Sequence, residues 1–331
     1  MANIPEVMRA LEQQSWEGPG ALRLIGDAPV PAPGPGEVLV RVGAAGINFA
    51  DVMQTRGTYD GGPKPPYLAG FEAAGEVVAL GNGVTGVSLG DRVIGTGYGA
   101  FAQYIVMTAA GVAPVPEGWT DEQALGLVLN WATALAALKP IGRLASGETV
   151  VISAAAGAVG QAALRMAKHY GATVIATASP DKHEAVRALG ADHVIDYRTQ
   201  DVATEVLRLT DGRGADLILE SVGGDTFRAS LAAARRVTGR VVVYGVAGGE
   251  AAITNWELNF KHQIHVIGLH IGVLIQQEPA SFAEITEELA TLRAAGVYPP
   301  GQPTVYDLAD GPKALAELEA RGTIGKLALR P

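Results

Sequence analysis

The amino-acid sequence predicts an α/β protein that combines a doubly wound parallel sheet with a second, β-rich domain. Strand-like and helical runs alternate between residues 126 and 271, whereas short strand-like runs separated by proline and glycine clusters fill residues 1–125. The chain has 331 residues, which is enough for two domains that each bury a hydrophobic core.

Composition and charge narrow the classes of function. Hydrophobic residues make up 48% of the chain and charged residues 18%, as in an ordinary globular protein. The net charge of −9 provides no basic surface, so nucleic acid and anionic membranes are disfavoured as partners. The N-terminal residues lack an apolar core and a cleavage signal, and no stretch approaches the ~18 apolar residues that span a bilayer. We therefore expect a cytoplasmic protein.

The sequence also argues against a metal site. The chain contains no cysteine, which excludes disulfides, thiolate catalysis and cysteine-ligated zinc. It contains six histidines, and none forms an H-x-x-x-H pair with a flanking acid. We expect no bound metal.

The β-rich domain is predicted over residues 1–125. Its strand-like runs include E-V-L-V-R-V, E-A-A-G-E-V-V-A-L and D-R-V-I-G, which are separated by clusters such as P-A-P-G-P-G and G-G-P-K-P-P. After residue 271 come a helix, S-F-A-E-I-T-E-E-L-A-T-L, a strand-like P-T-V-Y-D-L, a second helix and a final strand, K-L-A-L-R. We assign residues 272–331 back to this first domain.

The parallel sheet is predicted over residues 126–271. T-V-V-I-S is followed by the helical run A-V-G-Q-A-A-L-R-M-A-K-H-Y, and T-V-I-A-T-A by D-K-H-E-A-V-R-A-L. H-V-I-D then precedes V-A-T-E-V-L-R-L, D-L-I-L-E precedes T-F-R-A-S-L-A-A-A-R-R, and G-R-V-V-V-Y-G and I-H-V-I-G complete the series. Six strands with crossover helices indicate a doubly wound sheet.

Two glycine patterns compete as a dinucleotide-binding turn. A full G-x-G-x-x-G match occupies residues 81–86, but no helical stripe follows it, so we interpret it as a loop between strands. Residues 155–160 have alanine in place of the first glycine, yet they end a β-branched strand and open the longest helical pattern. We favour residues 155–160, because a pyrophosphate site needs the amides of a helix N-terminus. The alternative is a glycine-rich turn without a ligand.

Within this turn, Gly157 lets the backbone approach the pyrophosphate, and Gly160 lets the helix and strand pack closely. Ala155 requires only a turn that tolerates a methyl group. The residues assigned to pyrophosphate binding are Ala156, Gly157, Ala158, Val159 and Gly160.

The end of the second strand of this sheet indicates which dinucleotide binds. An NAD site places an acid there to bond the ribose 2′-hydroxyl, but this chain has Ser179, with Lys182 close behind and Tyr197 at the end of the third strand. Hydroxyl and ammonium donors suit a 2′-phosphate, which a carboxylate would repel. Asp181 argues against this interpretation, and the alternative is that Lys182 and Arg198 are solvated surface charges.

Taken together, the motifs resemble the medium-chain dehydrogenase/reductase superfamily, and within it the zinc-free quinone oxidoreductase branch. The resemblance covers nearly the whole chain through their order and spacing. The matching segments are G-I-N-F-A-D at 46–51, R-G-T-Y at 56–59, G-F-E-A-A-G-E-V at 70–77, G-D-R-V at 90–93, T-A-L-A-A-L at 133–138 and A-A-A-G-A-V-G at 154–160. Zinc-containing relatives have a cysteine near Asn48 and a histidine where this chain has Phe71, which cannot coordinate zinc.

The resemblance implies a Rossmann NADPH-binding domain over residues 126–271 and a GroES-like catalytic domain over residues 1–125, completed by 272–331. It implies hydride transfer from NADPH to a quinone or to the β-carbon of an α,β-unsaturated carbonyl. It also places further cofactor contacts by position, at Asn48, Thr133, Ser221, Val222, Gly223, Tyr244 and Gly245.

Without zinc, hydrogen-bond donors or a general acid must stabilise the developing oxyanion or enolate. Asn48 and Asp51 match the family's N-x-x-D, and Tyr59 matches the R-G-x-Y tyrosine of related enoyl-thioester reductases. These three residues are the catalytic candidates. The alternatives are that Asn48 and Asp51 cap a loop and that Tyr59 only fills space beside a proline-rich loop.

The substrate is less closely defined. Many quinone reductases have an aromatic residue where this chain has Met53, so we expect Met53, Gln54 and Trp131 to line a wider pocket, unless they serve only in packing. An enoyl-thioester or alkenal double-bond reductase and a non-catalytic NADPH-binding protein are the alternative functions. The resemblance also implies a homodimer joined through the last Rossmann strands near Val266.

Overall fold

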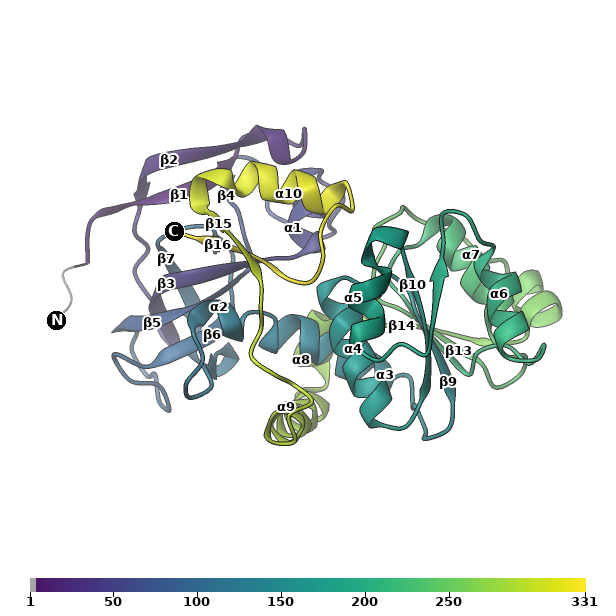
Figure 1. The fold of residues 1–331 in the computed structure, drawn as a ribbon. Coiled ribbons are helices and arrows are strands. Elements are labelled where there is room, and N and C mark those ends of the chain that lie inside the picture. The colour runs from purple at the N-terminus through teal and green to yellow at the C-terminus, as the bar shows by residue number, and fades with distance from the viewer. Residues whose placement is uncertain (1–3) are drawn as a thin grey trace. The chain divides into compact units, whose positions relative to one another are not determined.

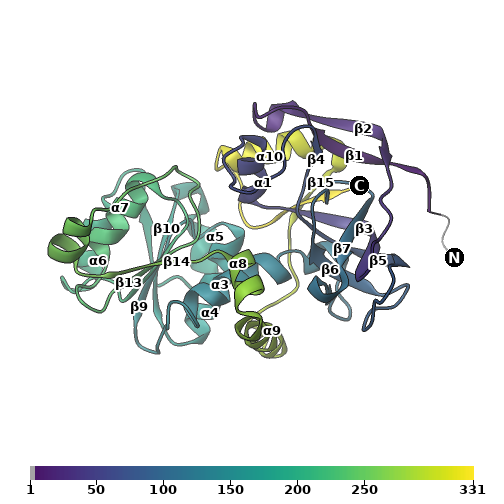
Figure 2. The same cartoon turned by 180° about the vertical axis from the view of Figure 1, so that it is seen from behind.

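The computed structural model describes residues 4–331. The chain divides into two compact units, Met1–Val128 with Pro300–Pro331, and Leu129–Pro299. Figures 1 and 2 show the elements of both units from opposite sides. The first unit contains two sheets and the second contains one, and each unit has its own buried core.

The second unit contains the doubly wound sheet that the sequence predicts. Its six parallel strands have the order β11-β10-β9-β12-β13-β14, so the chain reverses its direction of progress between β9 and β12. They are β9 (Thr149–Ile152), β10 (Thr173–Ala178), β11 (His193–Asp196), β12 (Leu217–Glu220), β13 (Arg240–Val243) and β14 (His265–Gly268). Every residue of β9 and β12 is buried, as expected for central strands covered on both faces.

Helices cover both faces of this sheet. The helices α4 and α5 lie on one side of the strands, and α6 and α7 lie on the other (Figure 1). They are α4 (Ala158–His169), α5 (His183–Ala188), α6 (Val202–Leu209) and α7 (Gly224–Ala233). The α/β fold class with a doubly wound sheet is confirmed.

Residues 272–299 differ from the sequence-based assignment, because they group with the second unit rather than with the first. Here α8 (Ile271–Gln277) and α9 (Pro279–Ala294) accompany α3 (Ala132–Leu138). The apolar stripe of α9, which contains Ile285, Leu289 and Leu292, is buried in this unit. The sequence shows such a stripe but not which neighbour buries it.

The first unit is β-rich and is completed by the C-terminal segment. Its larger sheet has the order β15-β16-β3-β5-β6-β8, with β7 also paired to β3, and its smaller sheet has the order β2-β1-β4. The strands are β1 (Val7–Gln13), β2 (Leu22–Pro29), β3 (Glu37–Ile47), β4 (Tyr67–Leu68), β5 (Glu72–Leu80), β6 (Arg92–Thr96), β7 (Tyr104–Thr108), β8 (Ala113–Pro114), β15 (Thr304–Asp307) and β16 (Leu327–Arg330). Its helices are α1 (Phe49–Thr55), α2 (Asp121–Ala124) and α10 (Gly311–Glu319).

Short helical segments connect these elements. The 3-10 turns are η1 (Pro19–Ala21), η2 (Ala109–Gly111), η4 (Pro180–Lys182) and η6 (Leu308–Asp310), and the π-helical segments are η3 (Leu127–Trp131) and η5 (Glu257–His262).

The full glycine match at residues 81–86 lies in the loop between β5 and β6, as the sequence predicts. The Gly81 amide donates to the Glu37 carbonyl at 2.8 Å. A Cβ at Gly81 would lie 1.8 Å from the Gly34 carbonyl oxygen, so glycine is required by a close backbone approach. No helix begins there, and the segment therefore lacks the amides that a phosphate needs.

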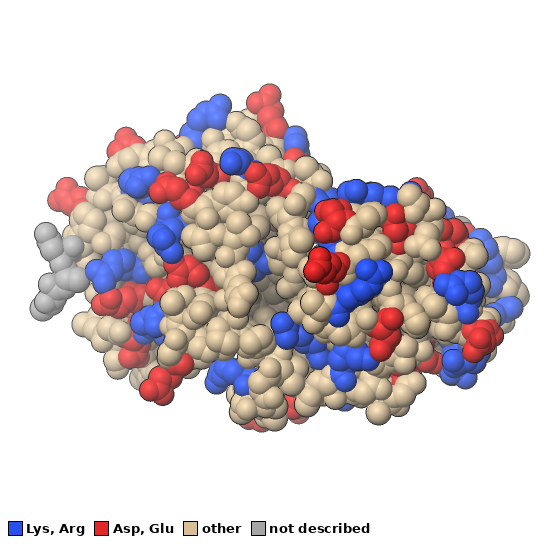
Figure 3. Space-filling model, in the orientation of Figure 1, with Lys and Arg blue, Asp and Glu red and all other residues tan. Residues whose placement is uncertain are grey.

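Charges are distributed evenly over the face shown in Figure 3. Basic and acidic side chains alternate there, with no large area of one sign. Within residues 4–331 the structure contains no helix that is both long enough and apolar enough to cross a membrane.

Candidate functional site

The turn between β9 and α4 places backbone amides at the start of a 12-residue helix. Gly157 caps α4 with extended backbone angles, and Gly160 lies in the first turn of the helix. A Cβ at Gly160 would lie 2.5 Å from the Ala154 carbonyl oxygen, whereas a Cβ at Gly157 would meet only that oxygen, at 3.3 Å. Gly160 thus allows the helix to pack on the turn, and the space around Gly157 remains open.

The structure explains why the first glycine of the fingerprint can be alanine. The left-handed residue of the turn is Ala154, with φ of 49°, and it precedes the fingerprint position. Ala155 is buried and donates its amide to the Thr177 carbonyl at 3.1 Å, which ties the turn to the end of β10. The Gln161 side-chain amide donates to the Ala156 carbonyl at 3.1 Å and holds the turn from the helix side. Residues 156–160 therefore form a fixed N-terminus for α4.

The predicted ribose-binding residues come together at the ends of β10 and β11. These strands pair in parallel with Ala178 opposite Asp196, so Ser179 and Tyr197 leave the sheet side by side. The side chains of Ser179 and Lys182 are buried, at 2% and 8% exposure. Burial holds the pKa of Lys182 below its ordinary value, despite the nearby Asp181. Lys182 is thus largely buried, and its role in binding a 2′-phosphate remains a prediction.

Asp181 and Arg198 lie at the rim of this group. An Arg198 guanidinium nitrogen lies 4.0 Å from an Asp181 carboxylate oxygen. A hydrogen bond from Ser179 lowers the pKa of Asp181, with further contributions from Lys182 and Arg198. Asp181 is therefore ionised and exposed, and it is partly compensated by these three neighbours.

The ends of β12 and β13 form a second loop pair in this unit. The Tyr244 amide donates to the Glu220 carbonyl at 2.9 Å, and the Ala247 amide donates to the Ser221 carbonyl at 3.2 Å. The amides of Val222 and Gly223 donate to the buried Glu220 carboxylate at 2.5 and 3.0 Å. These two amides are engaged by the protein, so the predicted cofactor contacts at 221–223 would use other atoms.

Tyr244 and Gly245 follow β13 directly in the same loop pair. Burial raises the pKa of Tyr244, and a hydrogen bond with Ser221 opposes that effect. The Tyr244 hydroxyl is therefore un-ionised and acts within the protein as a partner of Ser221.

Thr133 and Trp131 lie in or next to α3. Thr133 is half-buried in the first turn of that helix. The Trp131 ring stacks on Tyr298, with ring centroids 3.7 Å apart and planes inclined by 13°. Packing within the second unit thus accounts for Trp131, and its assignment to a substrate pocket remains a prediction.

In the first unit, strand pairing gathers polar residues from three segments of the chain. Leu327 of β16 lies opposite Ile47 of β3, and Gly46 of β3 lies opposite Glu72 of β5. Asn48 and Lys326 are adjacent to these positions. The Lys326 ammonium donates to the Asn48 side-chain oxygen at 2.8 Å and to Glu72 Oε2 at 2.6 Å.

Asn48 is oriented by this network. Its side-chain nitrogen donates to Glu72 Oε2 at 3.1 Å, while its oxygen accepts from Lys326. The ammonium and the carboxylate therefore determine which side of the amide carries the oxygen. Asn48 serves the local structure, and its role as a donor to a substrate remains a prediction.

Asp51 lies in the first turn of α1 and is 2% exposed. Its Oδ2 accepts a hydrogen bond from the Asn48 amide at 2.7 Å, so the capping role considered from the sequence is present. Its Oδ1 has no hydrogen-bond partner among residues 4–331. Burial raises the pKa of Asp51 to about 7, with smaller opposing contributions from the Asn48 bond and Lys326.

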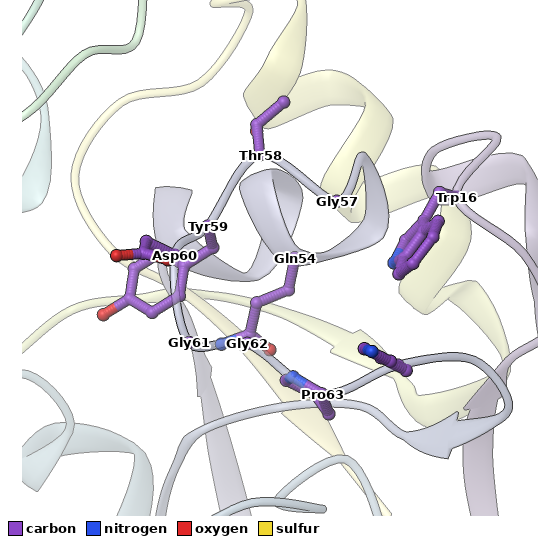
Figure 4. A pocket seen from close by; sticks show the side chains of 10 residues that line it. Trp16, Gln54, Gly57, Thr58, Tyr59, Asp60, Gly61, Gly62 and Pro63 are labelled. Carbon is purple, nitrogen blue, oxygen red and sulfur yellow. The ribbon is translucent and has the colours of Figure 1, made fainter.

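Tyr59 lies on the loop that follows α1, beside a cavity of about 300 Å³. Figure 4 shows Tyr59 and Trp16 at opposite ends of the lining residues, with Gln54 between them. Gln54 is buried and Met53 is half-buried. Burial, followed by Tyr98 and Asp51, raises the pKa of Tyr59, so the phenol keeps its proton at neutral pH.

The sequence interpretation did not identify Glu72, Lys326 or Tyr67 as part of this region. Glu72 stands in the G-F-E motif, where only Phe71 was considered, and it is fully buried. The Tyr67 hydroxyl is buried and has no hydrogen-bond partner within the described chain. A glutamate at the start of the apolar run that forms β5 was the one available signal.

Among residues 4–331, no cluster of three or more histidine, aspartate or glutamate side chains is arranged to hold a metal ion. The absence of bound metal therefore remains a prediction for elemental analysis.

Two family models match the chain. The alcohol dehydrogenase GroES-like domain matches residues 34–117, and the zinc-binding dehydrogenase model matches residues 158–291. The synaptic vesicle membrane protein VAT-1 homolog of Rattus norvegicus is 32% identical over 320 residues, which cover 91% of this chain and 78% of the relative. A polyketide synthase of Mycobacterium tuberculosis, described as mycocerosic acid synthase-like, is 36% identical, but the chain spans only 14% of its length.

Solved structures give the same result. The Escherichia coli quinone oxidoreductase, described as complexed with NADPH, superimposes with a TM-score of 0.90 at 31% identity, covering 98% of this chain and all of that one. The CurK enoyl reductase superimposes with a TM-score of 0.88 at 28% identity, covering 98% and 99% of the two chains. The chain is an oxidoreductase-family protein that belongs to the medium-chain dehydrogenase/reductase superfamily, in its quinone oxidoreductase branch.

Proposed function

We propose that this protein is an NADPH-dependent oxidoreductase that transfers a hydride to quinones or α,β-unsaturated carbonyls without zinc. The observation that carries the proposal is the pair of strand ends where Ser179, Lys182 and Tyr197 meet, next to the fixed N-terminus of α4. That N-terminus supplies amides for a pyrophosphate, and the strand ends supply donors for a 2′-phosphate.

The residues present fit NADPH. The open space around Gly157 admits a phosphate against the helix amides, and the buried Lys182 lacks the solvent that would otherwise compete for a phosphate. NADPH would supply the hydride. The same proposal includes the cofactor contacts predicted at Thr133, Ser221–Gly223, Tyr244 and Gly245. Because the amides of Val222 and Gly223 already bond to Glu220, side chains and carbonyls would contact the cofactor in this loop.

In the first unit, the side chains are suited to supplying a proton rather than a hydride. Tyr59 keeps its phenolic proton at neutral pH and can donate it to an enolate. Asn48 is held in one orientation by Glu72 and Lys326, which limits its freedom to follow a substrate. We assign Tyr59 the role of general acid and propose Asn48 and Asp51 as its supporting residues.

The proposal is tested by a screen of NADPH oxidation with benzoquinone, naphthoquinones, simple enones and crotonyl thioesters. We expect turnover with at least one quinone or enone, and slower turnover with NADH. Activity confined to the thioesters would favour the enoyl-thioester reductase, to which the similarity with the CurK enoyl reductase also points. Quenching of NADPH fluorescence without oxidation by any acceptor would leave a non-catalytic NADPH-binding protein.

We also propose a cytoplasmic homodimer joined through β14, which is the terminal strand in the order of its sheet. Trp256 and Phe260, in the segment just before this strand, are 61% and 67% exposed, and their ring centroids lie 6.1 Å apart. An exposed aromatic pair beside an unpaired strand edge is typical of an association surface.

Light scattering after gel filtration tests the dimer. We expect the unmutated protein to be dimeric and the Trp256→Ser/Phe260→Ser variant to dissociate. Trp16→Ser, which removes another exposed tryptophan, is the control and should leave the dimer intact. A monomer at all concentrations, or a dimer that the double variant leaves unchanged, would contradict this assignment.

A further inference from the structure

The first unit contains a buried charge cluster with more acids than bases. Glu72 is fully buried, Asp51 is 2% exposed, and the Lys326 side chain is 10% exposed. The ammonium of Lys326 lies 2.6 Å from Glu72 Oε2. Two carboxyl groups thus share a region that holds one ammonium group.

Glu72 accepts hydrogen bonds from most of the donors in this cluster. Its Oε2 accepts from both Lys326 and Asn48, and its Oε1 accepts from the Gly126 amide at 2.6 Å. Three donors therefore engage the two oxygens of this carboxylate. Lys326 donates in turn to Asn48, so both of these hydrogen bonds direct the ammonium away from Asp51.

Among the described residues, Asp51 therefore has no direct ion pair, although the Lys326 charge is near enough to act on it. One of its oxygens caps α1, and the other has no partner in the described part of the chain. The ionisable groups that face it are Glu72 on β5, Lys326 before β16, Tyr67 on β4 and Tyr59 on the loop after α1. Of these, only Lys326 favours the ionised carboxylate, whereas burial and Glu72 favour the protonated acid.

The tyrosines cannot remove that proton at neutral pH. Burial and the nearby Asp51 raise the pKa of Tyr67 to about 12, and the pKa of Tyr59 is also raised. With its own pKa raised to about 7, Asp51 exchanges its proton near neutrality.

We propose that Asp51 is the proton store of the reaction, and that its burial, beside an ammonium group already bonded to Glu72 and Asn48, keeps its unpaired oxygen protonated. The inference rests on the proposed function, since it assigns the source of the proton that the reduction of a conjugated carbonyl consumes. Asp51 acts through Tyr59 and does not itself need to touch the substrate.

The step balances as follows. Reduction of an α,β-unsaturated carbonyl adds a hydride from NADPH to the β-carbon and a proton to the α-carbon. The Tyr59 O–H bond breaks as the α-carbon C–H bond forms. The Asp51 O–H bond then breaks as the phenol is re-formed, and the carboxylate regains a proton from solvent.

Infrared spectroscopy of the purified full-length protein tests the store without requiring activity. We expect a protonated-carboxyl band that disappears as the pH rises through the neutral range, and we expect Asp51→Asn to lack it. In Glu72→Gln the midpoint should move to lower pH by about one unit, because a like charge is removed. A neutral-range carboxyl titration that survives Asp51→Asn, or the absence of any such titration, would overturn the proposal.

The pH profile of enone reduction tests the role in turnover. In the unmutated protein, kcat/KM should fall above the same midpoint, and Asp51→Asn should lower kcat/KM about 10- to 100-fold and remove this limb of the profile. A profile that Asp51→Asn leaves unchanged would overturn the role of Asp51 while the proposed function stands. If the carboxyl of Asp51 titrates in the neutral range but none of the acceptors supports NADPH oxidation, the proposed function is rejected. The role of Asp51 as a proton store for that reaction is then rejected with it.

Discussion

The candidate cofactor site of the second unit is made mainly of backbone, whereas the candidate acid site of the first unit is made of buried side chains. Around α4, amides and strand ends supply the binding groups, and Gly160 matters because it lacks a side chain. Around Asp51, two carboxyl groups and one ammonium group determine where a proton resides. Substitutions that add side-chain volume should therefore impair the cofactor site, whereas substitutions that remove a charge or a proton should impair the acid site.

The largest expected effect concerns the acid site. Tyr59→Phe keeps the ring but removes the phenolic proton, so kcat on enones should fall on the order of 10²- to 10⁴-fold while NADPH affinity is kept. Quinones accept electrons more readily and should be affected less, which provides an internal control. Equal losses below about threefold on both substrates would show that Tyr59 only fills space.

A second effect separates function from stability at Asp51. The folded-state pKa of about 7 lies above the ordinary value of 3.8, so the folded state binds more protons than the unfolded state between these values. The free energy of unfolding therefore falls as the pH rises from about 4 to 7, by at most about 4 kcal/mol. Asp51→Asn should be more stable than the unmutated protein above pH 7 and lose this advantage near pH 4.

Urea unfolding at several pH values measures this difference. A variant that is less stable than the unmutated protein at every pH would show that the carboxylate of Asp51 stabilises the fold, against this account.

A third effect concerns the cofactor site. Lys182→Ala removes the buried ammonium at the end of β10, so NADPH binding should weaken by about 1.5 to 3 kcal/mol, or roughly 10- to 150-fold. NADH lacks the 2′-phosphate, and its affinity should barely change. Calorimetry with both cofactors measures the difference, and equal affinities of the unmutated protein for NADH and NADPH would remove the 2′-phosphate assignment.

The smallest effect compares two glycines in one turn. A methyl group at Gly160 would lie 2.5 Å from a backbone oxygen, so Gly160→Ala should cost about 1 to 3 kcal/mol of stability and weaken NADPH binding. Gly157→Ala, whose methyl would meet that oxygen at 3.3 Å, should fold normally and affect only the bound phosphate. Thermal unfolding with and without NADPH separates the two, and equal destabilisation would argue against this view of the turn.

The sequence predicted much of the second unit, because the relevant signals are local. A β-branched run followed at once by a helical run identifies a parallel strand and its crossover helix, and the same context selected residues 155–160 over residues 81–86. The assignment of residues 272–299 had no comparable signal. The buried stripe of α9 would fit any apolar surface, and only tertiary structure shows that the second unit buries it.

The acid site of the first unit was predicted only in part. Asn48, Asp51 and Tyr59 lie within one short segment and could be found by motif. Glu72 and Lys326 are 254 residues apart, and they meet only because β16 and β5 flank β3 on either side. The proton affinity of Asp51 depends on this pairing, and no local pattern encodes it.

The most direct test of the account is an isotope-labelling experiment on the product of enone reduction. With NADPH deuterated at the transferred position, in ordinary water, the account predicts one deuterium at the β-carbon of the product. In deuterium oxide with unlabelled NADPH, it predicts one deuterium at the α-carbon, because that proton comes from exchangeable groups of the protein. Label from NADPH at the α-carbon, or the lack of a reduced product with any enone or quinone, would contradict it.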